Sequence, residues 1–256
     1  MIHLQQLGKR YGGAEPWAVR RVDLEIERGE LLVLLGESGC GKTTTLKMIN
    51  RLIEPTEGRI TVGGEAVTAM HPVSLRRRIG YVFQGIGLFP HMTIGENIAV
   101  VPKLLNWRPA EIEARVEALL GLMRLPAAAY RDRWPGELSG GQQQRIGVAR
   151  ALAARPEVML MDEPFGALDL LTRDRLQGEY RGLHAQLNLT TVMVTHDVNE
   201  ALLMADRIAV MRGGGLLQLA TPGELMREPV DAYVAALMRT PRQQAERIES
   251  LTEGRS

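Results

Sequence analysis

A glycine-rich segment that ends in a lysine and a threonine is the part of this sequence best suited to chemistry. Gly36–Thr43 reads Gly-Glu-Ser-Gly-Cys-Gly-Lys-Thr, the G-x-x-x-x-G-K-T pattern of a phosphate-binding loop. Its glycines let backbone N–H groups approach phosphate oxygens closely, and a following helix points its positive end at them. Lys42 should reach the β- and γ-phosphates, and the Thr43 hydroxyl should ligate Mg²⁺. The segment therefore predicts a site for a nucleoside triphosphate and its magnesium ion.

Two adjacent carboxylates follow an apolar run later in the chain. Val158–Met161 leads directly into Asp162 and Glu163. Because ligands collect at the carboxyl ends of strands in open α/β sheets, Asp162 is expected to hold Mg²⁺. Glu163 is expected to orient and deprotonate an attacking water. Gln84 and His196 also follow predicted strands, and their types leave two alternatives open: a role beside the γ-phosphate or magnesium, or ordinary packing.

A second glycine turn lies far from the first. It reads Leu-Ser-Gly-Gly-Gln-Gln-Gln-Arg over Leu138–Arg145. Ser139 sits where a helix N-cap belongs, ahead of a helix predicted at Gln142–Ala153. A glycine turn at a helix N-terminus is itself suited to binding an anion. The chain is therefore expected to carry two phosphate-binding turns.

Alternating strands and helices are expected to position these residues. The predicted strand Glu30–Leu35 and the predicted helix Thr43–Arg51 flank the first glycine loop, as a phosphate loop requires. The later alternation favours a mostly parallel sheet with right-handed crossovers, and the helical pattern from about Thr93 to Arg133 predicts an inserted lobe. The other predicted strands are Ile2–Leu7, Val19–Ile26, Gly58–Gly63, Ile79–Phe83, Val158–Met161, Thr190–Thr195 and Arg207–Met211, and the other predicted helices are Leu170–Leu187 and Val198–Met204.

Composition limits the class of protein. The 256 residues are 45% hydrophobic and carry a formal net charge of +1, which gives no support to a nucleic-acid partner bound through bulk charge. No apolar run approaches the roughly 18–20 residues that span a bilayer, and the amino terminus lacks a signal-peptide pattern. The single cysteine, Cys40, excludes an intrachain disulfide, so the chain is expected to be cytosolic. The run Arg76–Arg78 is interpreted as a solvated face, with partner contact as the alternative.

The ordered set of motifs resembles that of an ATP-binding cassette ATPase over residues 2–235. Gly36–Thr43 resembles Walker A, Gln84 the Q-loop, Leu138–Gln142 the signature, Val158–Glu163 Walker B, Ala167–Asp169 the D-loop and His196 the switch histidine. The resemblance implies an α/β P-loop NTPase with a mostly parallel core sheet, an N-terminal antiparallel β subdomain and an inserted α-helical subdomain at about 85–155. It implies an ATPase domain over 1–240, a polar tail over 241–256, and no C-terminal regulatory domain.

The same resemblance implies a set of site residues. Glu163, His196 and Gln84 would be catalytic, and Thr43, Gln84 and Asp162 would bind Mg²⁺. Two cassettes would pair head to tail as a homodimer, with Asp169 communicating between them. ATP would be bound by Tyr11, whose ring stacks on adenine, by Gly36, Glu37, Ser38, Gly39, Cys40, Gly41, Lys42, Thr43 and Thr44, and in trans by Ser139, Gly140, Gly141 and Gln142.

A finer resemblance concerns the transported solute. Ile86–Pro90 and Val101–Leu104 look like the corresponding segments of quaternary-amine importers, which take up glycine betaine, choline or carnitine. This implies transmembrane permease subunits, an indirect extracytoplasmic solute-binding protein, no nucleic acid, and a peripheral place on the cytoplasmic face of the inner membrane. Two alternatives stay open: an importer for another small solute such as an amino acid or polyamine, and a non-transport cassette acting on nucleic acid or ribosomes.

Overall fold

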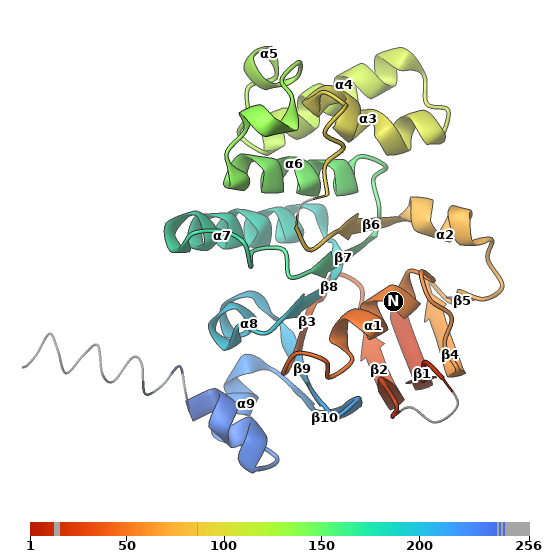
Figure 1. Ribbon diagram of the computed structural model, residues 1–256, viewed down its shortest axis with the longest axis vertical. Helices are drawn as coiled ribbons and strands as arrows, with labels where there is room; N and C mark the ends of the chain where they lie inside the picture. Colours follow the sequence, from red (N-terminus) through yellow and green to blue (C-terminus); the bar gives the residue numbers. More distant parts are fainter. Residues whose placement is uncertain (13–15, 86, 240, 242, 244–256) are drawn as a thin grey trace, which may run out of the picture.

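Two β-sheets and a separate layer of helices organise the chain (Figure 1). The computed structural model describes residues 1–12, 16–85, 87–239, 241 and 243. The strands are β1 Ile2–Lys9, β2 Val19–Ile26, β3 Leu31–Leu35, β4 Glu57–Val62, β5 Glu65–Ala66, β6 Ile79–Val82, β7 Val158–Asp162, β8 Thr190–Thr195, β9 Arg207–Arg212 and β10 Gly215–Ala220. The helices include α1 Lys42–Ile49, α2 Pro72–Arg78, α3 Ile94–Leu104, α4 Pro109–Leu122, α5 Ala127–Tyr130, the 3₁₀ turn η1 Pro135–Glu137, α6 Gly140–Leu152, α7 Leu170–Leu187, α8 Val198–Met204 and α9 Pro222–Arg227, and residues 232–239 are also helical.

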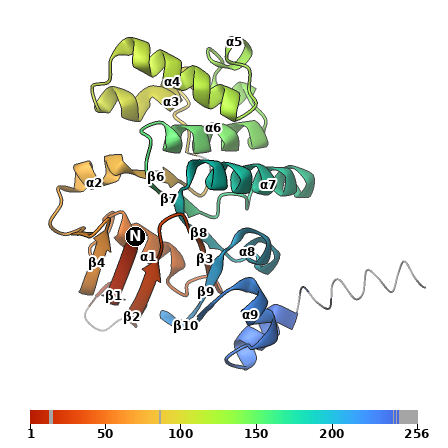
Figure 2. The ribbon, with the colours of Figure 1, turned by 180° about the vertical axis from the view of Figure 1, so that it is seen from behind.

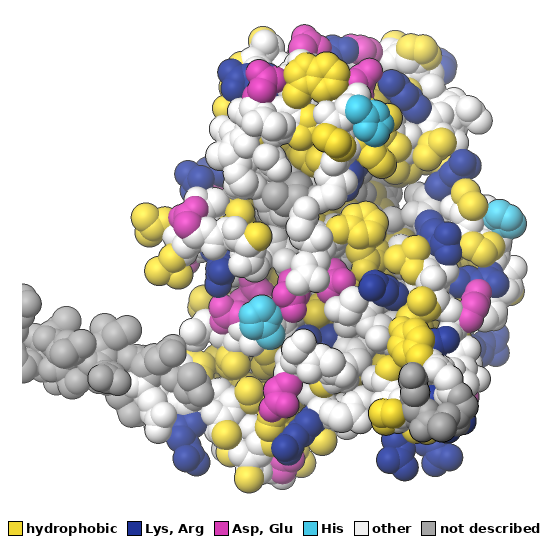
Figure 3. All heavy atoms as spheres, viewed as in Figure 1, with side chains coloured by type: hydrophobic (Ala, Val, Ile, Leu, Met, Phe, Trp, Pro, Cys, Tyr) yellow, Lys and Arg dark blue, Asp and Glu magenta, His cyan; other side chains and the backbone are white. Residues whose placement is uncertain are grey.

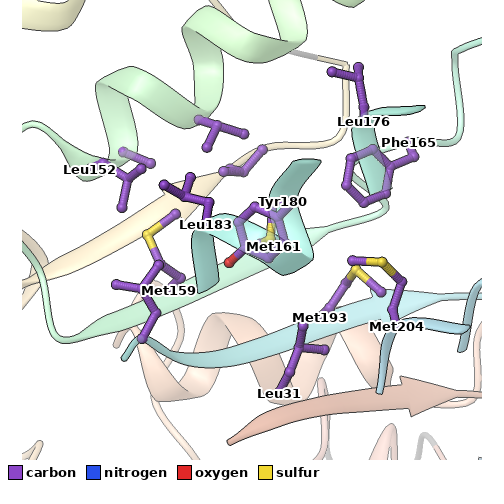
Figure 4. Packing of buried hydrophobic residues seen from close by; sticks show 14 of the residues in the cluster. Leu31, Leu152, Met159, Met161, Phe165, Leu176, Tyr180, Leu183, Met193 and Met204 are labelled. Carbon is purple, nitrogen blue, oxygen red and sulfur yellow. The ribbon is translucent and has the colours of Figure 1, made fainter. Parts of the chain in front are cut away.

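The larger sheet has the order β10-β9-β3-β8-β7-β6. Every pair in it is parallel except β9 with β10. All five residues of β3, the run Leu-Leu-Val-Leu-Leu, are buried, as expected of a parallel strand that is covered on both faces. On one face Leu31, Met159, Met161 and Met193 pack with side chains of α7, among them Tyr180 and Leu183 (Figure 4).

The smaller sheet is antiparallel, with the order β2-β1-β4-β5. Buried and exposed residues alternate along much of β2, because only one face of this sheet packs on the core. Its buried side chains share a cluster with α1 and with the other face of the larger sheet, including Leu32 and Val192. Helix α1 therefore carries the phosphate loop in the layer that joins the two sheets.

Helices α3 to α6 lie in the chain between β6 and β7 and form the layer seen at the top of both views (Figures 1 and 2). Thr93 begins α3 with a capping box, in which Thr93 and Glu96 each accept the other's backbone N–H. Such a pair satisfies two otherwise unpaired donors at a helix start. Among the residues that the structure describes, no helix is both long and apolar enough to cross a membrane.

The predicted fold class is confirmed, with a parallel core sheet, an antiparallel N-terminal sheet and a helical layer. The sequence analysis did not predict the short elements β5, α2, β10 and α9. Glu30 was assigned to a strand but precedes β3, and its carboxylate pairs with Arg207, Nε to Oε1, at 2.7 Å. Of the predicted tail 241–256, only residues 241 and 243 lie within the described part, and Ile86 lies outside it.

Candidate functional site

The phosphate loop joins β3 to α1 and depends on its glycines. Gly36, Gly39 and Gly41 all have positive φ, at 156°, 80° and 103°, a region that side chains disfavour. A Cβ at Gly36 would lie 2.2 Å from the carbonyl oxygen of Met211, and one at Gly41 would lie 2.4 Å from that of Ala18. The loop is therefore held between the start of β2 and the end of β9. Glu37 and Ser38 are exposed on it, whereas Cys40 is buried.

Lys42 is the charged group beneath this loop. It is 5% exposed, and its Nζ donates to the carbonyl oxygens of Gly36 at 2.7 Å and Glu37 at 2.9 Å. Those oxygens orient the ammonium group but carry no full charge. Burial of a cation without an anionic partner is costly, so the loop is suited to receive a negatively charged group. Phosphate fits this donor set of backbone N–H groups and one ammonium.

Thr43 and Asp162 meet at the start of α1. The Thr43 hydroxyl donates to Asp162 Oδ1 at 2.8 Å, which joins the first helix to the end of β7. Burial raises the pKa of the Asp162 carboxyl, although the Thr43 bond and the nearby Lys47 oppose this. A bound cation would offset that burial. One carboxylate and one hydroxyl are the kind of sparse oxygen ligation that Mg²⁺ accepts when phosphates supply the rest.

Glu163 is the centre of a three-residue cluster. Its Oε1 lies 3.1 Å from His196 Nδ1, and its Oε2 accepts from Gln84 Nε2 at 3.2 Å. The three residues follow β7, β8 and β6 respectively, so adjacent strands of one sheet bring them together. The backbone φ of Glu163 is +46°, which is uncommon for a residue other than glycine. Figure 3 shows acidic side chains gathered beside a histidine near the middle of the face that it displays.

The segment after Glu163 is tied to the histidine loop by a residue that sequence reasoning missed. Arg173 Nη1 pairs with Asp197 Oδ2 at 3.2 Å, and its Nη2 donates to the carbonyl oxygens of Gly166 and Leu168 at 3.4 and 3.3 Å. Asp197 directly follows His196. A basic residue in the first turns of a helix gives no sequence signal that separates it from an ordinary surface arginine.

Asp169 is the N-cap of α7. Its Oδ1 accepts from the backbone N–H of Thr172 at 3.1 Å, and hydrogen bonds from Thr172 lower the pKa of the Asp169 carboxyl. The side chain is therefore fixed at the end of the predicted D-loop, by the first turn of the helix that follows it.

The second glycine turn opens α6. Ser139 is the N-cap, and it forms a capping box with Gln142, whose side chain also donates to the Tyr130 hydroxyl at 3.0 Å. Ser139 and Gly140 are exposed. A Cβ at Gly141 would lie 2.5 Å from Thr172 Cγ2, so α6 and α7 approach closely at their first turns. The structure places this turn in the helical layer, apart from the phosphate loop in both ribbon views (Figures 1 and 2).

Tyr11 lies in the connection between β1 and β2. Its side chain is 49% exposed, and Lys9 Nζ lies 5.2 Å from the ring centroid. Ala18, in the same connection, touches Gly41 of the phosphate loop. The tyrosine is thus an accessible aromatic ring on a segment that borders the loop.

Comparison with known proteins agrees with this geometry. The pattern of the ABC transporter family matches residues 19–166. The glycine betaine/carnitine/choline transport ATP-binding protein OpuCA of Bacillus subtilis is 55% identical over 91% of this chain, and the match spans 61% of OpuCA. The glycine betaine uptake system ATP-binding protein YehX of Escherichia coli is 47% identical over 91% of this chain and 75% of its own.

A more distant relative and a solved structure complete the comparison. The spermidine/putrescine import ATP-binding protein PotA of Thermobifida fusca is 46% identical over 93% of this chain and 62% of its own. The dimeric, post-hydrolysis structure of the ATP-binding cassette MJ0796 bound to ADP and Pi superposes with a TM-score of 0.77 at 34% identity, over 87% of this chain and 99% of that one. On these matches, and with its loop, carboxylates and glycine turn arranged as described, the chain belongs to the ABC transporter family.

Proposed function

We propose that this chain is the ATP-hydrolysing subunit of an importer that takes up a quaternary-amine compatible solute through a separate membrane permease. The observation that carries the ATPase part is the Glu163 cluster beside the Thr43–Asp162 pair. It joins a carboxylate held by two polar side chains to a phosphate loop. The cassette comprises residues 1–240 in this proposal, with a helical subdomain at about 85–155.

Each residue of the cluster has a defined task in the proposal. The loop Gly36–Thr44 and Lys42 bind the phosphates, while Tyr11 stacks on the adenine. Thr43, Asp162 and Gln84 hold Mg²⁺, which when bound supplies charge stabilisation at the phosphates. Glu163 accepts a proton from water, and its fixed contacts with Gln84 and His196 orient it for that role.

A second copy of the chain completes the site. The first turn of α6 presents the Ser139 hydroxyl and the backbone N–H groups of Gly140 and Gly141, with Gln142 beside them, but it lies in a different layer from Lys42. A head-to-tail homodimer places that turn of one copy against the phosphate loop of the other, with Asp169 at the junction. The MJ0796 cassette, whose solved structure is a dimer bound to ADP and Pi, supports this arrangement.

The solute assignment rests on the relatives. OpuCA and YehX are named for glycine betaine, carnitine or choline, and the sequence segments Ile86–Pro90 and Val101–Leu104 resemble those of the same class. The permease subunits, a solute-binding protein that acts through them, and a peripheral place on the cytoplasmic face of the membrane follow from an importer. Polyamine uptake is the second candidate, because PotA is only slightly less similar than YehX.

The test is uptake by cells that carry this chain at its chromosomal locus. Labelled glycine betaine, choline, carnitine and spermidine are given separately at raised osmolarity to wild type and to Glu163→Gln. Other betaine importers are deleted in both strains, so that they cannot mask a defect. We expect the variant to lose uptake of one or more quaternary amines and to keep spermidine uptake. Loss of spermidine uptake alone would transfer the assignment to polyamines, and unchanged uptake of all four would overturn both.

A further inference from the structure

A pocket that opens to solvent lies between the helical layer and α7, and it is called the cavity below. It has a volume of about 320 Å³ and lies between the end of α4, the middle of α6 and the face of α7. Its apolar wall includes Val148, Phe165, Leu176 and Leu183, and Figure 4 shows the last three among the packed core side chains. None of the nucleotide-site residues proposed above lines it.

Two exposed glycines lie where this cavity meets the solvent. Gly178 and Gly182 are one turn apart on α7 and both line the cavity. A Cβ at either would meet no atom within 4 Å, so no close approach of another segment in the described structure requires a glycine there. A glycine inside a helix costs about 1 kcal/mol relative to alanine. Glycine at both positions therefore lowers the stability of α7 relative to alanine and leaves space at the edge of the cavity.

A buried polar group also lines the cavity. The Gln144 side chain is 3% exposed, and its Nε2 has no hydrogen-bond partner among the described residues. A buried donor without a partner is uncommon in folded proteins and unfavourable. A molecule in the cavity with an acceptor oxygen would satisfy this donor.

The charges at the cavity's edge already have partners. Arg145 pairs with both carboxylate oxygens of Glu179 at 3.0 Å and donates to the Met123 carbonyl oxygen at 3.3 Å. Arg124 lies 3.5 Å from Glu179. Because these arginines already contact Glu179, no charged occupant is needed to pair them.

We propose that this cavity is a binding site for a small, uncharged organic molecule with an apolar body and one hydrogen-bond acceptor. The apolar body contacts Val148, Phe165, Leu176 and Leu183, and the acceptor oxygen receives the Gln144 Nε2–H. Since a cavity of about 150 Å³ holds benzene, the occupant has about twice that size. The site goes beyond the proposed transport function and does not depend on it.

The test uses two bicyclic probes of nearly the same shape. 1-Indanone carries a ketone oxygen, and indane lacks it. Each is titrated into the full chain and followed by NMR chemical-shift changes, with affinities compared between the probes. We expect 1-indanone to bind the wild type about tenfold more tightly than indane, the effect of one buried hydrogen bond.

Three variants separate this site from adventitious binding. Gln144→Met should remove the preference for 1-indanone, and Gly182→Leu should abolish binding of both probes by filling the cavity. Gly121→Leu is the control, because Gly121 is an exposed helix glycine with open space around it that does not line the cavity. It should bind as the wild type does. If Gly182→Leu does not fold, Gly178→Ala replaces it and should weaken both probes severalfold.

Three results would overturn the proposal. They are equal affinity of the two probes for the wild type, binding by a folded cavity-filled variant that matches the wild type, and no chemical-shift change up to the solubility limit of 1-indanone.

Discussion

At the scale of single residues, Glu163 is the one described residue of the proposed site, glycines aside, with a positive φ. Its left-handed backbone costs on the order of 1–3 kcal/mol for a residue other than glycine. Its N–H donates to the Val194 carbonyl oxygen at 3.0 Å, so β8 helps to hold it there. The backbone turn aims the carboxylate at Gln84 and His196 instead of continuing the strand.

Glu163→Gln tests the proton-accepting role. The amide keeps the size of the side chain but cannot take a proton from water, so kcat for ATP should fall by about 100-fold or more. Nucleotide affinity should change little. Steady-state ATPase assays and equilibrium nucleotide binding check this, with Glu117→Gln on the exposed face of α4 as a matched control. A variant with near wild-type kcat would remove Glu163 from this role.

Arg173→Lys tests the link between the D-loop and the histidine loop. The guanidinium holds Asp197 and two carbonyl oxygens at once, and a lysine cannot reproduce this planar fork. We expect kcat to fall about tenfold while the KM for ATP stays within twofold, because Arg173 lies outside the phosphate loop. Asp197→Asn should give a similar pattern. A change confined to KM, or a loss explained by unfolding in circular dichroism, would contradict a positioning role.

At the scale of elements, the crossing of α6 and α7 is set by a glycine. Gly141→Ala would bring a Cβ within 2.5 Å of Thr172 Cγ2, and overpacking of this kind typically costs about 1–3 kcal/mol. Urea unfolding measures the loss. Thr172→Ser removes the opposing methyl group but keeps the backbone N–H that donates to Asp169. The double variant Gly141→Ala/Thr172→Ser should therefore regain most of the stability. If the double variant instead lost the sum of the two single-variant losses in stability, the contact between residues 141 and 172 would not determine how closely α6 and α7 approach.

The junction of α7 and α8 should respond to pH. Glu200 is buried, accepts from Gln177 Nε2 at 2.9 Å, and has its carboxyl pKa raised by burial and by Asp197, although Thr195, Gln177 and Arg173 oppose this. A raised folded pKa means that the folded chain binds more protons, so this group's contribution to stability falls as pH rises. The fall begins near the unfolded value of about 4.3 and is complete above the folded value.

Glu200→Gln lacks this titration and keeps an acceptor for Gln177. Its free energy of unfolding relative to wild type should therefore be greater at pH 7 than at pH 4. Urea unfolding of both proteins at pH 4 and pH 7 gives this difference in free energy. The other titrating groups are the same in both proteins, so their contributions cancel. A difference independent of pH would show that Glu200 ionises as easily in the folded chain as in the unfolded one.

Sequence patterns predicted the buried elements better than the peripheral ones. The apolar runs of β3, β7 and β8 are fully buried, so their composition alone identified them. Helix α2 buries only Leu75, and its three arginines were interpreted as a solvated face, with no helix predicted there. β10 is an edge strand of intermediate burial. Where burial is partial, hydrophobic pattern carries little information.

At the scale of the whole molecule, the proposed dimer gives each chain two half-sites, the phosphate loop and the first turn of α6, which lie in different layers. Ser139→Arg should place a bulky cation on the turn proposed to act on the other copy's phosphate, so ATPase activity should fall about 100-fold or more. ATP binding to the monomer should stay within twofold, because Lys42 and its loop are untouched. Ser139→Ala is the conservative control and should lose less. Equal loss of monomer binding would show that the turn acts within its own chain.

The positions of the candidate site residues were predictable where those residues lie at the ends of strands. Asp162, Gln84 and His196 each lie at the end of a strand of one sheet or just after it. The order of the motifs along the chain therefore indicated that these three side chains lie near one another. The contacts of Arg173 and the left-handed turn at Glu163 were not predictable, since both depend on how α7 and β8 pack in three dimensions.

The position of β3 has a consequence for how the chain is made. This strand lies between β8 and β9, whose residues Thr190–Arg212 are translated long after Leu31–Leu35. A nascent chain that ends before Thr190 therefore contains the complete phosphate loop but neither of the strands that hold its base. Such long-range pairing forms slowly and leaves apolar strands exposed meanwhile. Nucleotide binding is thus an ability that the polypeptide acquires only after β8 and β9 have been synthesised.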